Sequence, residues 1–283
     1  MNYTERAILF ECHGDRLVGI LAQPERSVCD AGVVVVVGGP QYRVGSHRQF
    51  VHLSRTLADA GIPCLRFDYR GMGDSEGTPR EFTNVSDDIA AAVEGLLERC
   101  PSVRNVVLWG LCDGATASAF CAAGEPRISG LVLLNPWVHT EHGEARAYLK
   151  HYYIKRLASA AFWRKLRQGD FSVGRSLGDA WQLLRSAVNT RTTGEEALAM
   201  ENLPLPDRLR ESLAERPTRI LILLSGRDFV AREFEDLIKG DESWTPVLSR
   251  ATVRRMPKAD HTFSDPKDAA LAAETTRDWL LDR

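Results

Sequence analysis

Three side chains that lie far apart in the sequence have the right types for a nucleophilic attack: Cys112, Asp228 and His261. The cysteine lies in a Gly-x-Cys-x-Gly box that directly follows the β-branched and aliphatic run "NVVLW". A tight turn from a strand into a helix leaves no room for bulk on either side of such a residue, and Gly110 and Gly114 provide that room. The turn also sets the thiol beside the positive end of a helix, which favours the thiolate. The pattern predicts that Cys112 is a nucleophile.

The acid and the base follow in the order nucleophile, acid, histidine. Asp228 comes just after the apolar run "ILILLSG", and His261 lies in "ADHTF", before the last predicted helix. Of the seven histidines, His261 alone lies beyond that acid. In these roles Cys112 attacks an acyl carbonyl, His261 carries the proton, and Asp228 fixes the imidazole tautomer. The alternative is a core cysteine with a structural histidine.

An attack on a carbonyl also needs two backbone N–H donors for the developing oxyanion. One is expected from Asp113, the residue after the nucleophile. The other is expected from the loop "GGPQYR", in which Pro40 has no N–H, so Gln41 is the predicted donor, with its side-chain amide as a second possible contributor. The Asp113 carboxylate is expected to point away from the oxyanion. It would either pack at the helix start or contact a lid or substrate.

Candidate substrate contacts lie next to this loop and in the second half of the chain. Arg43 and His47, with Arg48, are predicted to bind an anionic group of the substrate; an ion pair of these residues with "FDYRGMGD" is the alternative. Trp137 and Tyr152 are further predicted substrate contacts. The sequence has neither metal-ligand spacing nor a Gly-x-x-x-x-Gly-Lys loop, so no metal and no cofactor is expected.

The elements that must position these residues alternate between strands and helices. The β-branched run 32–40 is typical of a strand that is buried on both faces of a parallel sheet. An N-terminal hairpin is predicted from "RAILFE" and "RLVGILAQP", followed by a short strand in "IPCLRF". The other predicted strands are 105–109, 128–136, 218–226 and 251–257, and the predicted helices are 47–61, 85–100, one from about 113, 232–240 and 265–283. This order predicts an α/β fold with a mostly parallel, doubly wound sheet.

One long segment interrupts the alternation. Residues 140–217 show helical patterns without a strand pattern, and we predict a helical lid inserted into a core of residues 1–139 and 218–283. Residues 140–191 carry ten Lys and Arg against four Asp and Glu, a net charge of +6. These charges indicate either a solvated helix face or a basic rim that attracts an anionic substrate such as a coenzyme A, phosphopantetheine or acidic saccharide ester.

Composition limits the classes of partner. The chain has 283 residues and a formal net charge of −2, which does not favour nucleic acid or an anionic membrane as a partner. It shows no secretory h-region and no stretch of 18 apolar residues. The six cysteines have no CxxC pair and no disulfide-framework spacing, which is typical of reduced thiols. We therefore expect a cytoplasmic protein with a small-molecule partner. The sequence does not predict its oligomeric state.

Several motifs carry a resemblance to known families. The stretch "RFDYRGMGDSEG" resembles the loop after the fourth strand of the α/β-hydrolase fold, "ADHTF" resembles its histidine loop, and the likeness extends over nearly the whole chain. More closely, "GGPQYRVGSHRQF", "LRFDYRGMGDSEG" and "GLCDGA" together resemble the exosortase A system-associated hydrolase 1 family. This resemblance implies a hydrolase encoded near bacterial exopolysaccharide and protein-sorting genes. The chain departs from the fold's common His-Gly start at Gly38, which stands where that histidine would be.

Cysteine in place of serine favours particular acyl chemistry. A thiolate forms more easily than an alkoxide, and a thioester acyl-enzyme passes its acyl group to amines and thiols as well as to water. The sequence therefore predicts an acyl hydrolase that cleaves an ester or thioester through a covalent intermediate on Cys112. The alternatives are an acyltransferase that uses a coenzyme A or carrier thioester, and a non-catalytic binding protein with the same fold.

Overall fold

The computed structural model describes residues 2–138, 203–215 and 218–282. By its contacts the chain forms two compact units, residues 1–138 with 209–283 and residues 139–208. The first unit, the core, resumes at Leu209, within helix α8 (Leu205–Ala214) and earlier than the predicted boundary at 218. Most of the predicted lid, 140–217, lies outside the described residues, so the lid stays a prediction.

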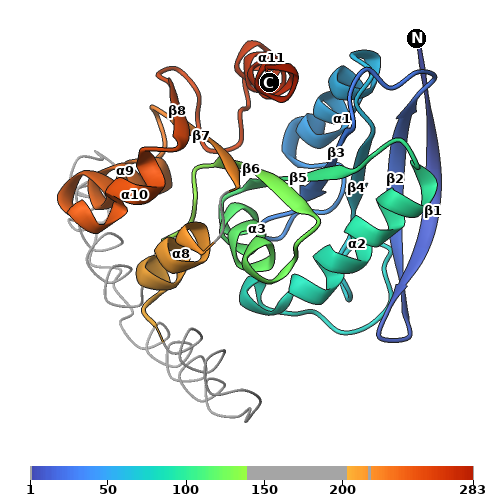
Figure 1. Cartoon of the computed structure of the whole chain (residues 1–283), viewed down its shortest axis with the longest axis horizontal. Coiled ribbons are helices and arrows are strands. Elements are labelled where there is room, and N and C mark those ends of the chain that lie inside the picture. Colours follow the sequence, from blue (N-terminus) through green and yellow to red (C-terminus); the bar gives the residue numbers. More distant parts are fainter. Residues whose placement is uncertain (1, 139–202, 216–217, 283) are drawn as a thin grey trace, which may run out of the picture. The chain divides into compact units, whose positions relative to one another are not determined.

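The core is one eight-stranded sheet with the order β1-β2-β4-β3-β5-β6-β7-β8 (Figure 1). The predicted N-terminal hairpin is present, and its second strand pairs antiparallel with β4. All further pairings, from β4–β3 to β7–β8, are parallel, so the predicted fold class is confirmed. The strands are β1 (Tyr3–Cys12), β2 (Asp15–Pro24), β3 (Ala31–Val36), β4 (Cys64–Phe67), β5 (Asn105–Leu111), β6 (Ile128–Leu134), β7 (Arg219–Ser225) and β8 (Ala251–Met256).

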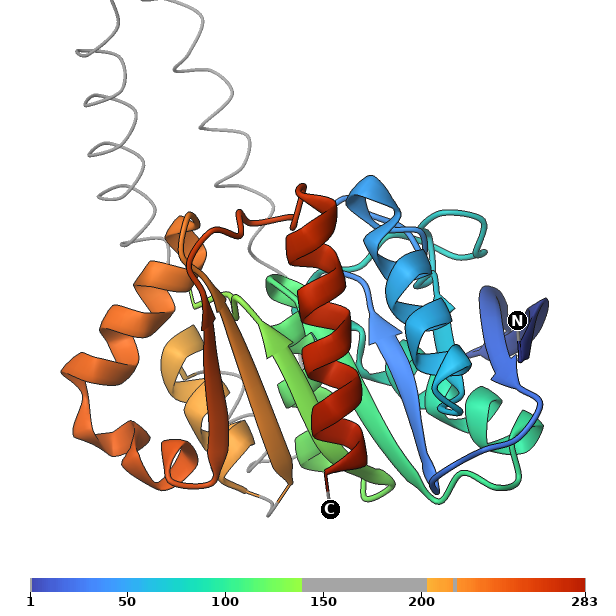
Figure 2. The same ribbon diagram turned by 90° about the horizontal axis from the view of Figure 1, so that it is seen from above.

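Helices cover both faces of the sheet. Figures 1 and 2 show α1 and α11 on one face and α2 and α3 on the other. The central strands are apolar throughout because both of their faces are covered, and all five residues of the run 33–37 in and after β3 are buried. The helices of this unit are α1 (Gln49–Asp59), α2 (Ser86–Arg99), α3 (Asp113–Gly124), α9 (Phe229–Gly240), α10 (Thr245–Leu248) and α11 (Pro266–Leu281), with 3-10 turns η1 (Ser46–Arg48), η2 (Phe82–Asn84) and η3 (Glu242–Trp244). No helix among the described residues is long and apolar enough to span a membrane.

Two predicted boundaries shift for local reasons. The strand predicted over 32–40 ends at Val36, because the chain turns at Gly38 and Gly39, the latter with φ +58°. The helix predicted from 47 begins at Gln49, because His47 and Arg48 adopt left-handed φ angles of 53° and 60°. Both shifts lengthen the loop that contains "GGPQYR".

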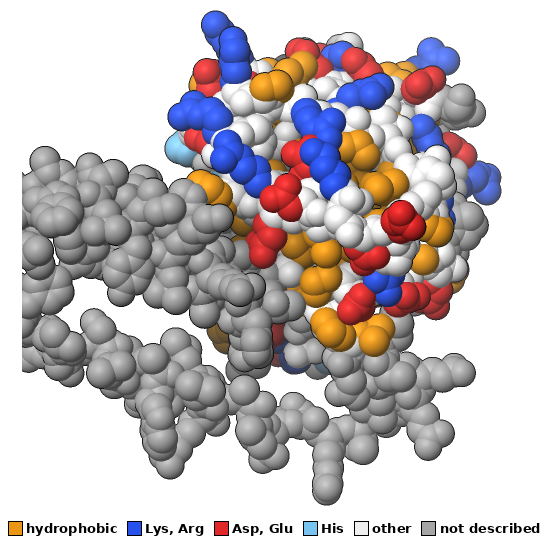
Figure 3. Space-filling model, turned by 90° about the vertical axis from the view of Figure 1, so that its left-hand side faces the viewer, with side chains coloured by type: hydrophobic (Ala, Val, Ile, Leu, Met, Phe, Trp, Pro, Cys, Tyr) orange, Lys and Arg blue, Asp and Glu red, His pale blue; other side chains and the backbone are white. Residues whose placement is uncertain are grey.

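The parallel strands bring the three predicted catalytic residues to one edge of the sheet. Cys112 follows β5, Asp228 follows β7, and His261 follows β8. The carboxyl ends of parallel strands share one edge, which is where ligands bind in open α/β sheets. The face drawn in Figure 3 carries Lys and Arg side chains interspersed with Asp and Glu, with hydrophobic side chains between them.

Candidate active site

The turn that holds Cys112 has a strained backbone. Cys112 has φ 61° and ψ −127°, which L-residues rarely adopt. Backbone hydrogen bonds to other segments hold this conformation: the N–H of Cys112 donates to the Leu134 carbonyl at 2.9 Å, and its carbonyl accepts from the N–H of Trp137 at 3.3 Å as well as from the first turn of α3. A Cβ at Gly110 would lie 2.4 Å from the Gly114 carbonyl oxygen, and one at Gly114 would lie 2.6 Å from the Val36 carbonyl oxygen. The Gly-x-Cys-x-Gly spacing is therefore a steric requirement of the turn.

The predicted acid and the predicted histidine are hydrogen bonded to each other. His261 Nδ1 lies 2.9 Å from Asp228 Oδ2. The Asp228 side chain is 6% exposed, and it also caps α9 by accepting from the N–H groups of Val230 and Ala231, both at 3.3 Å. These contacts fix the carboxylate. A carboxylate only accepts hydrogen bonds, so the imidazole donates to Asp228 from a protonated Nδ1.

The surroundings of His261 make its imidazole strongly basic. The hydrogen bond with Asp228, followed by a side-chain hydrogen bond with Cys112, raises the pKa of His261 from 6.5 to about 10, although burial opposes the rise. Since Nδ1 is bound to Asp228, Nε2 is the nitrogen left to face the thiol. An imidazole of this basicity stays protonated on both nitrogens at neutral pH, and the second proton can be the one that leaves the Cys112 thiol.

The loop after β3 lies beside this turn and contains Gln41. The Gln41 side-chain carbonyl accepts from the N–H of Ser46 at 2.9 Å, so its oxygen is used within the loop. Among the described residues, no hydrogen-bond acceptor is found for the backbone N–H of Gln41. That N–H is thus available to a ligand, and its role as an oxyanion donor stays a prediction.

The Asp113 carboxylate packs at the start of α3, which is one of the two predicted alternatives. It also makes a contact that the sequence did not predict. Its Oδ1 accepts from the N–H of Gly114 at 3.0 Å, at the start of α3, and also from the N–H of Gly39 at 2.7 Å. The side chain therefore points to the loop after β3. Burial raises the pKa of Asp113 above its ordinary value, and hydrogen bonds from the backbone amides of Gly39, Gly114 and Asp113 itself act against the rise. A Cβ at Gly38 would lie 2.3 Å from the Leu111 carbonyl oxygen and 2.4 Å from Asp113 Oδ1, so no side chain fits there.

Residues 33–274 match the model of the alpha/beta hydrolase family. The chain belongs to this family. The matched range begins within β3 and ends within α11, so it includes Cys112, Asp228 and His261.

Curated relatives match this alpha/beta hydrolase over short segments. A polyketide transferase of Penicillium is 30% identical over 91 residues, which is 30% of this chain and 31% of that protein. Lysophosphatidylserine lipase ABHD12 of Danio rerio is 29% identical over 121 residues, which is 41% of this chain and 30% of that protein. The chain thus spans less than half of the length of the curated relatives that it matches, between 20% and 44%.

Solved structures share the fold over almost the whole chain. An esterase of Pyrococcus furiosus has a TM-score of 0.68 at 15% identity, covering 99% of this chain and 91% of that one. Est1E from Butyrivibrio proteoclasticus, with ferulic acid bound, has a TM-score of 0.62 at 16% identity, covering 97% of this chain and 98% of that one. At such identities the likeness concerns the fold.

The other predicted substrate contacts differ in their surroundings. The Arg43 guanidinium forms ion pairs with Asp68 and Asp74, and the Arg43 side chain is only 15% exposed. The ion-pair alternative is therefore the one observed for Arg43, and its charge is already compensated. His47 and Arg48 lie on the same loop, and both are exposed to solvent.

Trp137 contacts the turn through its backbone. It is half-buried, its N–H bonds the Cys112 carbonyl, and its own carbonyl accepts from the Thr116 hydroxyl at 2.7 Å. Trp137 thus lies next to the nucleophile, as a substrate contact must. Tyr152 lies outside the described residues.

Sequence reasoning missed a polar pair behind the site. Asn135, which is fully buried with φ 46°, donates from Nδ2 to the Ser225 hydroxyl at 3.0 Å, and its Oδ1 accepts from the Ser225 N–H at 2.9 Å. This pair ties together the ends of β6 and β7. A usable signal was the Asn directly before Pro136 at a strand end, because Asn tolerates left-handed φ better than most residues.

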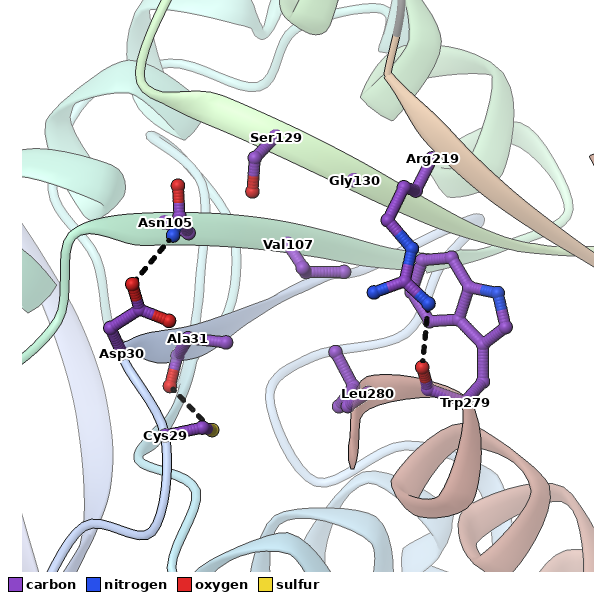
Figure 4. A pocket seen from close by; sticks show the side chains of 10 residues that line it. All are labelled: Cys29, Asp30, Ala31, Asn105, Val107, Ser129, Gly130, Arg219, Trp279 and Leu280. Atoms are coloured by element: carbon purple, nitrogen blue, oxygen red, sulfur yellow. Dashed lines mark hydrogen bonds between the residues drawn. The ribbon is translucent and has the colours of Figure 1, made fainter. Parts of the chain in front are cut away.

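A pocket of about 430 Å³ lies at the opposite edge of the sheet, where β3, β5, β6 and β7 begin. Figure 4 shows Arg219 over the Trp279 ring and Asp30 bonded to Asn105 there. The pocket is remote from Cys112 because that residue follows the other end of β5. In the part of the chain that the structure describes, no group of three or more His, Cys, Asp or Glu side chains could hold a metal ion.

Proposed function

We propose that this alpha/beta hydrolase is an acyl hydrolase that cleaves an ester or thioester through a covalent acyl-enzyme on Cys112. The observation that carries the proposal is the hydrogen bond between Asp228 and His261, together with the interaction with Cys112 that helps to raise the pKa of His261 and the position of the cysteine on a strained turn between strand and helix. Such a series matches the nucleophile, base and orienting acid of acyl-transfer enzymes.

In the resting enzyme the Cys112 thiol proton already lies on Nε2 of His261, as a thiolate–imidazolium pair. In the first half of the reaction the thiolate attacks the acyl carbonyl, and a bond forms between Sγ and the carbonyl carbon. When the tetrahedral intermediate collapses, the bond to the leaving oxygen or sulfur breaks. The leaving group takes the proton from Nε2, and a Cys112 thioester remains. Asp228 keeps the Nδ1 proton in place and stabilises the imidazolium throughout.

In the second half, His261 takes a proton from water, which attacks the thioester carbonyl. The bond between Sγ and the acyl carbon then breaks, the free acid leaves, and the proton stays on His261, which restores the thiolate–imidazolium pair. In both halves the negative oxygen would accept from the N–H groups of Asp113 and Gln41. Each such donor contributes roughly 2.7–4 kcal/mol in enzymes where one has been removed.

The basicity of His261 supports a cysteine at this position. With a pKa of about 10, the imidazole stays protonated at neutral pH, and its positive charge stabilises a thiolate on Cys112 as a thiolate–imidazolium pair. A serine hydroxyl is a far weaker acid than a thiol, so the same imidazole would abstract its proton only as attack proceeds. We therefore expect Cys112→Ser to fold normally and to lose most of the activity.

Acyl transfer is the second candidate function. The similarity to a polyketide transferase over 30% of the chain favours it, and a thioester intermediate passes its acyl group readily to thiols and amines. The resemblance of three motifs to exosortase-associated hydrolases supports a role in bacterial exopolysaccharide or protein-sorting systems. The basic segment 140–191 favours an anionic acyl ester or thioester as substrate.

The test is product analysis with two acyl donors, p-nitrophenyl acetate and acetyl-coenzyme A. Each is incubated with the protein with and without an added amine or thiol acceptor, and free acid and acylated acceptor are quantified. Release of acid that Cys112→Ala abolishes is the expected result, while formation of acylated acceptor at the expense of acid identifies a transferase. Absence of turnover and of Cys112 acylation with both donors contradicts the proposal and favours a binding protein.

A further inference from the structure

Three contacts hold the loop after β3, and Gln41 lies between two of them. The Val37 carbonyl accepts from the Tyr69 hydroxyl at 2.8 Å, and the Gly39 N–H donates to Asp113 Oδ1 at 2.7 Å. Further along, the Arg43 N–H donates to Asp68 Oδ1 at 2.7 Å. The path of the chain through Gln41 is thus set on one side by Asp113 and on the other by Asp68.

The contact from Asp113 matters because this loop has little stiffness of its own. Gly38 and Gly39 follow each other, and glycine is the residue with the widest backbone freedom. Steric contacts allow no side chain at Gly38, where a Cβ would lie 2.3 Å from the Leu111 carbonyl oxygen. Rigidity must therefore come from a neighbouring segment. Asp113 supplies it from the turn that also carries the nucleophile.

The missing amide of Pro40 makes this positioning more demanding. An oxyanion donor works only when it is fixed near 2.7–3.1 Å from the place where the charge develops. With no N–H at Pro40, the donor of this loop has to be the next residue along, Gln41. The hydrogen bond from the Gly39 N–H fixes the Gly38–Gly39 peptide, one peptide before the proline ring, and with it the direction in which the chain continues.

We propose that Asp113 is a positioning residue whose Oδ1 fixes the loop after β3 against the turn of Cys112, so that the Gln41 N–H faces the acyl oxygen during attack. This inference rests on the proposed function. It assigns to the side chain of Asp113 a role separate from that of its own N–H.

The charge of the carboxylate is not the useful part. A negative charge beside a developing oxyanion opposes it, and two amides only partly compensate the charge. What the loop needs is an acceptor oxygen at this point. An asparagine offers the same oxygen without the charge, whereas a leucine has similar volume and offers no acceptor.

The experiment compares the wild type with Asp113→Asn and Asp113→Leu in two reactions of Cys112. The first is acylation by p-nitrophenyl acetate, followed as the initial burst of p-nitrophenolate, which passes through an oxyanion. The second is alkylation by iodoacetamide, followed by mass spectrometry of the Cys112 peptide, which forms no oxyanion. Thermal unfolding of each variant checks that it is folded, and Asp113→Ala, which removes the acceptor without added bulk, replaces the leucine variant if that one does not fold.

We expect Asp113→Leu to slow acylation about 10- to 100-fold, the range for a misplaced group or a lost donor, and to leave alkylation unchanged. Asp113→Asn should acylate at or above the wild-type rate. Equal acylation in all three proteins overturns the inference, as does an equal loss of both reactions or an equal loss in Asn and Leu. A wild type that is alkylated but never acylated contradicts the proposed function, and the inference falls with it.

Discussion

The two edges of the parallel sheet differ in how their residues are held. At the carboxyl edge, five non-glycine residues in the loops after the parallel strands have positive φ: His47, Arg48, Cys112, Asn135 and Phe263. The turn after β1 adds His13. At the amino edge, the residues that line the 430 Å³ pocket have ordinary backbones, and its polar groups serve packing: Arg219 bonds the last carbonyls of α11, at 3.0 Å to Trp279 and 2.7 Å to Asp282.

The difference shows that a cavity alone does not indicate the functional edge. Strained backbone persists only where surrounding contacts enforce it, and it gathers at functional sites. In this molecule the strain occurs together with a buried Asp228, a basic His261 and a loop with an available N–H. The amino-edge pocket has the volume, but its described lining residues include no histidine that could pair with Cys29.

The largest expected effect is on the acid of the series. Asp228→Asn should lower kcat/KM for an activated ester about 10⁴-fold, because the amide favours the wrong imidazole tautomer. The matched control is Asp265→Asn: Asp265 caps α11 by accepting from the Lys267 N–H at 2.9 Å, just as Asp228 caps α9. Steady-state kinetics and thermal unfolding of both variants are the measurement. Similar small losses of activity in both would reduce Asp228 to a helix cap.

A smaller effect is expected at the support of the Gln41 loop. Asp68→Asn removes the charge that pairs with Arg43 at the carboxyl edge and should lower the acylation rate about 10- to 100-fold by loosening the loop. Asp88, on α2, forms a comparable buried ion pair with Arg70, and both side chains are at most 3% exposed.

Asp88→Asn is thus the control for burial. Removing one partner of a buried pair costs about 3–5 kcal/mol in the free energy of unfolding, and both variants should show a loss of this size. Only Asp68→Asn should also slow acylation, measured well below the unfolding temperature of either variant. Slowing of the same extent in Asp88→Asn would mean that acylation merely follows global stability.

The pH dependence of stability should carry the signature of His261. Its folded pKa of about 10 lies above the ordinary 6.5, so the contact stabilises the fold fully below pH 6.5 and loses this contribution as pH rises through about 10. The free energy of unfolding of the wild type should therefore fall over this range more steeply than that of His261→Gln. NMR titration of the imidazole provides the direct value. Parallel curves for the two proteins would contradict the strong contact with Asp228.

The smallest effect is expected at the amino edge. Arg219→Ala removes the stacking on Trp279, with the guanidinium carbon 4.6 Å from the ring centroid, and the contacts to the end of α11. It should lower the free energy of unfolding by about 1 kcal/mol and leave kcat/KM unchanged. Chemical denaturation and ester hydrolysis assays measure the two quantities. A loss of activity without a loss of stability would indicate that the amino edge is energetically coupled to the active site.

Much of the fold could be predicted from the sequence because its signals are local. The β-branched run of β3 and the glycines around Cys112 report strand burial and a tight turn directly. The order of Cys112, Asp228 and His261 could be predicted because each follows a predicted strand. Side-chain partners were harder: that Arg43 pairs with Asp68, or that Asp113 reaches Gly39, depends on how loops from different strands meet, and no single segment of sequence encodes it.

The most direct test of a nucleophilic Cys112 is intact-protein mass spectrometry of the wild type and Cys112→Ala after rapid mixing with p-nitrophenyl acetate or acetyl-coenzyme A. We predict a mass increase of one acetyl group on the wild type that is absent from Cys112→Ala. An equal increase on wild type and Cys112→Ala, or none on the wild type while it turns over either donor, would contradict a covalent intermediate on Cys112.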